Sequence, residues 1–280
     1  MTYKTIQVSV DDSDLAEKRL KIAIDLASKV DSHLIGLHVI PPAFYPAYFS
    51  AEIPSSMIEQ QMSELKATAG RAQARFDRLV ANSGLQTEWR CVDQPYGDIA
   101  TVMKELARYA DLNVFGQNDP ELDDERSLDI AGTVMLGSGR PMLMVPYAGN
   151  FDSIGKKIVV AWNASRESTR AVFEAIPIMQ TAETVEILAI NAGDTPEAGT
   201  PHPGADIATT LARHGINATV KTTSADDVAI GNTLLNYVSD DGADLLVMGA
   251  YGHSRLREMI FGGATRSILE HMTVPVFMSH

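Results

Sequence analysis

Near its start the chain has a short β-rich stretch, Thr5-Ile-Gln-Val-Ser-Val-Asp-Asp-Ser13, and a second version lies past the middle, Lys157-Ile-Val-Val-Ala-Trp-Asn-Ala-Ser165. Each stretch ends in Asp or Asn, then a small or acidic residue, then Ser. Apolar residues at helical spacing follow both, over 15–27 and 167–176. A strand that leads into a helix twice in the same manner indicates an internal repeat.

The repeat continues through four further strand-like segments in each copy. The corresponding segments are 33–40 and 184–191, 84–92 and 215–223, 110–116 and 243–249, and 140–146 and 274–279. Helical patterns separate these segments, which is the order of right-handed βαβ units in a parallel sheet covered on both faces. We therefore predict an α/β fold of two tandem, doubly wound domains with five strands each. In such folds the ligand crevice lies beyond the carboxyl ends of the strands.

The join between the two copies is the polar, glycine-bearing segment 147–155. Domain boundaries fall in short polar segments of this kind. We place the boundary near Gly149, which predicts one domain over residues 1–148 and a second over residues 149–280.

One segment of the first copy has no counterpart in the second. Residues 41–50 contain four aromatic residues and three prolines without a charge, and a long helical pattern over 55–80 follows them. The ordinary interpretation is a loop that packs onto its own domain. The alternative is a lid over an apolar ligand, or a surface that binds a partner.

The composition narrows the class of protein. The 280 residues are 45% hydrophobic and 21% charged, as is typical of soluble globular proteins. Asp and Glu number 36 against 23 Lys and Arg, and a formal net charge of −13 disfavours a nucleic-acid partner. No apolar run approaches the roughly 20 residues that span a bilayer, and no signal peptide precedes the first strand. We expect a cytoplasmic protein with no membrane partner.

Cysteine and histidine give no sign of a disulfide or a metal centre. The single cysteine, Cys91, excludes an internal disulfide and a cysteine-cluster site, and we expect it to be a buried, inert thiol. The seven histidines lack the i, i+4 pairing of helical metal ligands. Neither Gly-x-Ser-x-Gly nor His-Glu-x-x-His is present, so nothing points to an efficient hydrolase.

The most informative motif follows the fourth strand of the second copy. Residues 245–248 lead into Gly249 and Gly252, and then, after a short amphipathic segment, into Gly262-Gly263, where a helix over 264–272 begins. Glycines let an anion approach the backbone N–H groups, and a helix N-terminus adds unpaired N–H groups and the positive end of its dipole. No Gly-Lys-Ser/Thr follows, so this is not a P-loop. The motif predicts a phosphate cradle; the plain alternative is a tight turn at a strand end.

The spacing Gly249-x2-Gly252-x9-Gly262, with its surroundings down to residue 276, resembles the nucleotide-binding motif of the universal stress protein family. The resemblance covers both copies and implies a tandem member with the adenine nucleotide alpha hydrolase-like fold. It implies a regulatory stress-response protein that binds ATP, with or without Mg²⁺, in its second domain. The residues that the resemblance places at the nucleotide are Asn163, Ile190, Met248, Gly249, Gly252, Gly262, Gly263, Ala264 and Thr265.

Two of these positions depart from the family's pattern. Gly263 stands where a Ser or Thr is expected, so a hydroxyl contact is lost unless Thr265 supplies it. Asn163 stands where ATP-binding members have Asp, although an amide can also donate and accept hydrogen bonds. An Asx cap on the following helix explains Asn163 equally well. Arg255 and Arg257 could reach a phosphate, but a solvated helix face is their more common role.

The first copy departs further. Asp11 keeps the carboxylate after the first strand, where we prefer an Asx cap as its role. After Gly116, residues 117–125 contain no second glycine and five carboxylates. Like charges would repel a polyphosphate there, so we expect that the first domain does not bind a nucleotide in the family's way.

Two functions remain open. The first is a regulatory protein that binds ATP in the second domain, with at most slow hydrolysis because no residue is evidently placed to activate water. The alternative is a scaffold that binds no nucleotide and instead binds a partner or a small apolar ligand. The resemblance also implies that the fifth strands, 141–145 and 275–278, pair within the chain as a pseudo-dimer about a pseudo-two-fold axis. Whether two chains also form a homodimer is left open.

Overall fold

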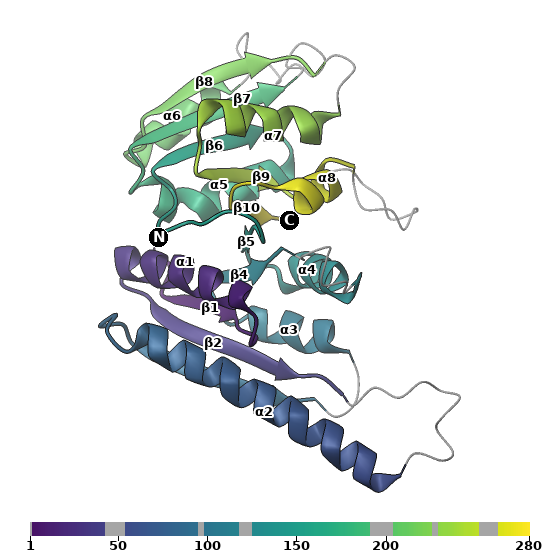
Figure 1. Ribbon diagram of the computed structural model, residues 1–280. Helices are drawn as coiled ribbons and strands as arrows, with labels where there is room; N and C mark the ends of the chain where they lie inside the picture. Colours follow the sequence, from purple (N-terminus) through teal and green to yellow (C-terminus); the bar gives the residue numbers. More distant parts are fainter. Residues whose placement is uncertain are drawn as a thin grey trace.

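A single ten-stranded sheet runs through the molecule in the computed structural model (Figure 1), which describes residues 2–42, 54–94, 98–117, 125–190, 204–225, 229–251 and 263–280. The strands are β1 (Thr5–Ser9), β2 (His33–Ile40), β3 (Thr87–Asp93), β4 (Leu112–Gly116), β5 (Met142–Val145), β6 (Lys157–Trp162), β7 (Thr184–Ile190), β8 (Ala218–Thr223), β9 (Leu245–Gly249) and β10 (Val276–Ser279). The helices are α1 (Asp14–Val30), α2 (Ser55–Val80), α3 (Ile99–Ala107), α4 (Glu125–Ser138), α5 (Arg166–Met179), α6 (Ala205–Arg213), α7 (Ile230–Asp241) and α8 (Gly263–His271).

The strand order is β3-β2-β1-β4-β5-β10-β9-β6-β7-β8. Strands β1–β5 with α1–α4 form the N-terminal half, and β6–β10 with α5–α8 form the C-terminal half. All pairs within a half are parallel, while β5 and β10 pair antiparallel, with Leu143 opposite Phe277. The predicted pairing of the fifth strands is therefore confirmed. Because that pair is antiparallel, the carboxyl ends of the two halves lie at opposite edges of the sheet.

Helices cover both faces of the sheet, as expected for doubly wound α/β units. Apolar side chains of α1, α2, α5 and α6 belong to one buried cluster, and those of α3, α4, α7 and α8 belong to a second cluster on the other face. The first cluster contains both Leu143 and Phe277, which are fully buried, so it continues across the seam between the halves. The two halves thus share their hydrophobic cores rather than only a strand edge.

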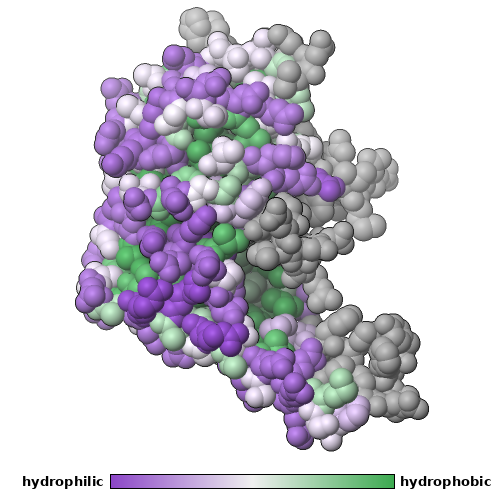
Figure 2. All heavy atoms as spheres, in the orientation of Figure 1, coloured by the Kyte–Doolittle hydropathy of each residue, from purple (hydrophilic) through white to green (hydrophobic). Residues whose placement is uncertain are grey.

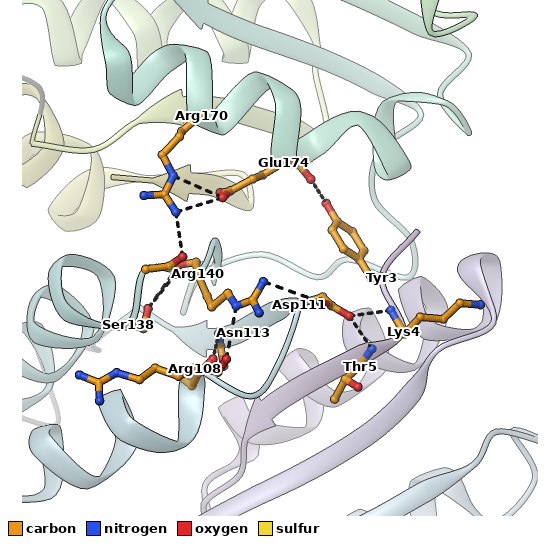
Figure 3. A network of polar contacts seen from close by, with 12 residues as sticks. Tyr3, Lys4, Thr5, Arg108, Asp111, Asn113, Ser138, Arg140, Arg170 and Glu174 are labelled. Atoms are coloured by element: carbon orange, nitrogen blue, oxygen red, sulfur yellow. Dashed lines mark hydrogen bonds and ion pairs between the residues drawn. The ribbon is translucent and has the colours of Figure 1, made fainter. Parts of the chain in front are cut away.

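Polar contacts reinforce the seam. Arg170 on α5 donates to the carbonyls of His280 and Gly139, each at 2.8 Å, and pairs with Glu174. Figure 3 shows Tyr3 pointing from the start of the chain to α5, where its hydroxyl donates to the Glu174 carbonyl. Burial, with a smaller effect from Glu174, raises the pKa of Tyr3 well above its usual value, so the phenol stays protonated and able to donate.

The segment between β5 and β6 lies along α1. Lys18 donates to the Tyr147 carbonyl at 2.9 Å, and Lys29 donates to the Ile154 carbonyl at 3.1 Å. The φ angle of Gly149 is 82°, a left-handed conformation that favours glycine. The domain boundary near Gly149 remains a prediction.

The long helix α2 begins at Ser55 and ends at Val80, as its pattern predicts. Three of its arginines form ion pairs with three acidic residues of α1 or of the turn before it. The pairs are Arg71 with Asp12, Arg75 with Asp14, and Arg78 with Glu17. Figure 2 shows the strongly hydrophilic surface over these two helices. The aromatic segment that precedes α2 lies largely outside the described residues.

The prediction of a buried Cys91 is wrong. Cys91 lies on β3, which is an edge strand, and the residue is exposed. An edge strand at the margin of the sheet has no neighbour on one side, so fewer of its side chains are covered. In the part of the chain that the structure describes, no helix is both long and apolar enough to cross a membrane.

Candidate functional site

The candidate site lies at the carboxyl edge of the C-terminal half, where β6 and β9 end and α5 and α8 begin. Gly249, the last residue of β9, is in close contact with the start of α5. A Cβ at this position would lie 2.5 Å from the Ser168 nitrogen and 2.6 Å from the Glu167 carbonyl carbon. Both are backbone atoms, so packing alone requires glycine here. Gly249 therefore has a structural role that is independent of any ligand.

The loop after β9 is connected to α8 by a hydrogen bond. The Tyr251 N–H donates to Oγ1 of Thr265 at 3.1 Å, and Thr265 is buried with 4% exposure. Tyr251 has a φ of 58°, a left-handed conformation that is uncommon for a residue with a bulky side chain. Thr265 thus holds the loop against the first turn of α8. A hydroxyl that accepts one hydrogen bond can still donate its own hydrogen, so Thr265 remains able to supply the hydroxyl contact expected at Gly263.

The first turn of α8 offers backbone donors. The first N–H groups of a helix have no acceptor within the helix, and the helix dipole favours an anion there. Gly263 is exposed, and among the described residues no atom would lie within 4 Å of a Cβ on it. Ala264 is half-buried, whereas Met248 is buried within β9. Four of the predicted residues, Gly249, Gly263, Ala264 and Thr265, therefore lie at the β9 end or the α8 start.

Asn163 and Ile190 lie at the same edge, because each ends or follows one of the paired strands β6 and β7. The side chain of Asn163 is exposed, and its Oδ1 accepts the Ser165 N–H at 3.1 Å. This Asx turn precedes α5, whose N-cap is Ser165, with Oγ accepting the Ser168 N–H at 3.1 Å. Asn163 thus forms the turn before the helix, while Ser165 is the residue that caps it. Gly252, Arg255, Arg257 and Gly262 lie outside the described residues.

The sequence analysis missed a carboxylate at this edge. Glu167, in the first turn of α5, is buried with 8% exposure, and its backbone and Cβ contact the end of β9 at Gly249. Its ion-pair contact is Nε of the exposed Arg166, 3.4 Å away. An acidic residue in the first turn suits the helix dipole, but it disfavours a polyphosphate unless a cation offsets the charge. Its position two residues after the N-cap Ser165 is the signal that could have drawn attention to it.

A model of the universal stress protein family matches residues 2–106 and 155–280. The chain belongs to this family. Over 98% of both chains it is 22% identical to Universal stress protein Slr1230 of Synechocystis sp.. In fold it is similar to a universal stress protein of Archaeoglobus fulgidus (TM-score 0.74, 16% identity, 98% of this chain and 95% of that one). It is also similar to the functionally unknown protein PA1789 of Pseudomonas aeruginosa (TM-score 0.59, 16% identity, 99% and 92%).

Within this universal stress protein, the equivalent edge of the N-terminal half is occupied by the protein's own Arg19. Arg19 is buried with 5% exposure, donates to the Ser9 carbonyl at 3.2 Å, and forms an ion pair with Asp11. A Cβ on Gly116, the last residue of β4, would lie 2.3 Å from Nη1 of Arg19. The guanidinium therefore fills the space beside the ends of β1 and β4.

Although Ser13, not Asp11, is the N-cap of α1, Asp11 forms an Asx turn just before that helix. Its Oδ1 accepts the Ser13 N–H at 2.9 Å, as Asn163 does with Ser165 in the other half. Burial alone would raise the pKa of Asp11, but the charge of Arg19 and the hydrogen bonds from Ser13 hold it below its usual value. The carboxylate is thus ionised and paired. Of the acidic segment 117–125, residues 118–124 lie outside the described residues.

A metal ion held by protein groups alone needs several His, Cys, Asp or Glu side chains close together. Among the described residues, no group of three or more His, Cys, Asp or Glu side chains could hold a metal ion. Mg²⁺ commonly binds through one or two carboxylates together with substrate phosphates. Glu167 is a carboxylate of the kind that could meet a cation brought by a nucleotide.

Proposed function

We propose that the C-terminal half binds an adenine nucleotide, ATP, at the carboxyl edge of β6 and β9. The observation that carries this proposal is the first turn of α8, which is held beside the β9 loop by the Thr265–Tyr251 hydrogen bond and at whose Gly263 no described residue would contact a Cβ. Backbone N–H groups at a helix N-terminus are suited to phosphate oxygens. Asn163 would meet the nucleoside through its amide, and Ile190 would meet the adenine through its backbone, as the resemblance implies.

In this proposal the nucleotide is a regulatory ligand, and hydrolysis is absent or slow. The α8 amides and the Asn163 amide bind and orient a ligand, but they do not remove a proton from water. Glu167 favours the magnesium complex of ATP over the free anion, because a cation offsets its charge. Occupancy would then set the shape of the chain or its choice of partner.

A second function, a scaffold that binds no nucleotide, is favoured by two observations. The Asn163 side-chain oxygen already accepts the Ser165 N–H at 3.1 Å, as an Asx turn requires without any ligand. Glu167 adds a buried carboxylate beside Gly249. Under this alternative the chain acts through a partner or a small apolar ligand.

Calorimetric titration with magnesium-ATP distinguishes the two functions, with AMP and GTP as comparison ligands. ATP binding predicts saturable heat at about one site per chain, and Gly252→Val abolishes it. Gly70→Val is the matched control, since Gly70 is an exposed glycine of α2 with open space around it. Binding retained in Gly252→Val would refute the site, and the absence of heat at millimolar nucleotide would favour the scaffold.

A further inference from the structure

Gln117 links the N-terminal half to the helix that begins at the proposed nucleotide site. It directly follows β4 and is buried with 4% exposure. Its side-chain amide nitrogen donates to the carbonyl oxygens of Leu269 at 2.9 Å and of Glu270 at 3.0 Å. Its Oε1 accepts the Tyr147 N–H at 3.2 Å. All three contacts use the full length of the side chain.

The two carbonyls belong to the last turn of α8. The final carbonyls of a helix have no partner within it, so an external donor stabilises that end. Gln117 supplies both of its amide hydrogens there, from the other half of the chain. The opposite end of α8, at Gly263 and Ala264, is the first turn that we propose to bind phosphate. Nine residues of helix separate the two ends by only about 13 Å.

The contact of Gln117 with α8 has no equivalent at the matching position of the C-terminal half. The residue that corresponds to Gln117 in the C-terminal half is Ala250, which follows β9 as Gln117 follows β4. Alanine has no side-chain donor, so the C-terminal half cannot support α4 in the same way. The support of α8 is therefore a specific feature of the N-terminal half and not a consequence of the repeat.

We propose that Gln117 is a positioning residue for the nucleotide site, through its hold on the C-terminal end of α8. This inference rests on the proposed function. Gln117 sets the direction in which the first turn of α8 presents its N–H groups, and it connects that helix to Tyr147 in the segment between the halves. By thermodynamic reciprocity, a nucleotide that fixes α8 also strengthens the contacts of Gln117 with Tyr147.

The remaining contacts of α8 keep the helix folded without Gln117. Ile268 and Leu269 are buried in the core of that face, and Thr265 bonds to the Tyr251 N–H. Replacement of Gln117 by leucine, an apolar residue of similar size, therefore changes the placement of the helix rather than its existence. We expect nucleotide affinity to fall about tenfold while unfolding stays cooperative.

The test compares magnesium-ATP titrations of the parent chain, Gln117→Leu and Gln180→Leu. Gln180 is a matched control, because its amide donates to the His214 carbonyl at 2.9 Å, at the end of α6 on the other face of the sheet. The inference expects weaker binding in Gln117→Leu and unchanged binding in Gln180→Leu. Binding by Gln117→Leu within twofold of the parent would overturn it and leave the proposed function intact.

A second measurement begins with the parent chain, in which the stability of a variant plays no part. Hydrogen exchange of the parent chain should slow at the Tyr147 amide when magnesium-ATP saturates the protein, and Gln117→Leu should lose this effect. An unchanged Tyr147 amide in a parent that binds ATP would overturn the inference alone. If neither the parent nor Gln180→Leu binds ATP, the proposed function fails, and the positioning role fails with it.

Discussion

Substitution of Gly249 by alanine separates the packing role of this glycine from any role in binding. The new Cβ would lie 2.5 Å from the Ser168 nitrogen and 2.6 Å from the Glu167 carbonyl carbon. Since ordinary contact begins near 3.4 Å, the start of α5 must retreat by about 0.9 Å. Helix α5 cannot do so freely, because Arg170 and Glu174 fix it to the seam.

We therefore expect Gly249→Ala to lower the free energy of unfolding by about 2–3 kcal/mol, the upper part of the range for overpacked sites. Gly263→Ala is the control, because its Cβ meets no atom of the described residues within 4 Å, and we expect a change within about 0.5 kcal/mol. Urea unfolding at 25 °C, followed by circular dichroism and tryptophan fluorescence, measures both. A loss below about 1 kcal/mol in Gly249→Ala would refute the close approach of α5 to β9.

Three further predictions concern other described residues. Thr265→Val removes the acceptor for the N–H of the β9 loop and should cost about 1–2 kcal/mol in urea unfolding; an unchanged midpoint would contradict the contact. Because the pKa of Asp11 is lowered in the folded chain, its carboxylate stabilises the fold above the unfolded pKa of about 3.9, and this contribution is lost as the pH falls through the folded pKa. Unfolding midpoints measured between pH 5 and pH 2 should thus fall more steeply in the parent than in Asp11→Asn, and parallel curves would count against the Arg19 pair. Cys91 is exposed while partial burial raises the pKa of its thiol, so a thiol reagent should label one cysteine per native chain, faster as the pH rises; resistance until unfolding would show that the thiol is covered.

The repeat predicted the α/β fold of two tandem five-stranded units, and the family resemblance implied the pairing of the fifth strands, whose antiparallel direction comes from the structure. The bounds were accurate where a strand or helix is isolated, as for β2 and α2. The predicted first residue of a strand was too early where the strand follows a helix directly. Residues 215–217, which we assigned to a strand, instead end α6: Ile216 donates its N–H to the Leu211 carbonyl, and Gly215 has a φ of 79°. These residues form the C-terminal cap of α6, although their apolar pattern resembles the start of β8.

The site was less predictable, because its decisive contacts join segments far apart in the chain. Gly249 suggested a ligand, whereas the structure shows that Glu167 and Ser168 already require glycine there. The interaction of Gln117 with α8 spans about 150 residues and follows no motif. The error at Cys91 has a similar origin, since the apolar pattern of a strand does not reveal whether that strand lies at the edge of the sheet.

The two halves share the turn that follows their first strands, but they differ in the side chain that lies beside it. Asp11 and Asn163 form the same Asx turn, so the turn does not distinguish a ligand site from a filled one. The distinction lies six residues after each N-cap serine, where α1 has Arg19 and α5 has Ala171. A buried guanidinium is tolerated because Asp11 neutralises it, and removing Arg19 would leave a carboxylate rather than an anion site. Alanine at the second position cannot reach Gly249 as Arg19 reaches Gly116, and the atoms next to Gly249 are instead those of Glu167 and Ser168. In the proposed function the backbone donors of the first α8 turn bind the phosphate, which makes the placement of α8, and thus of Gln117, important for that half.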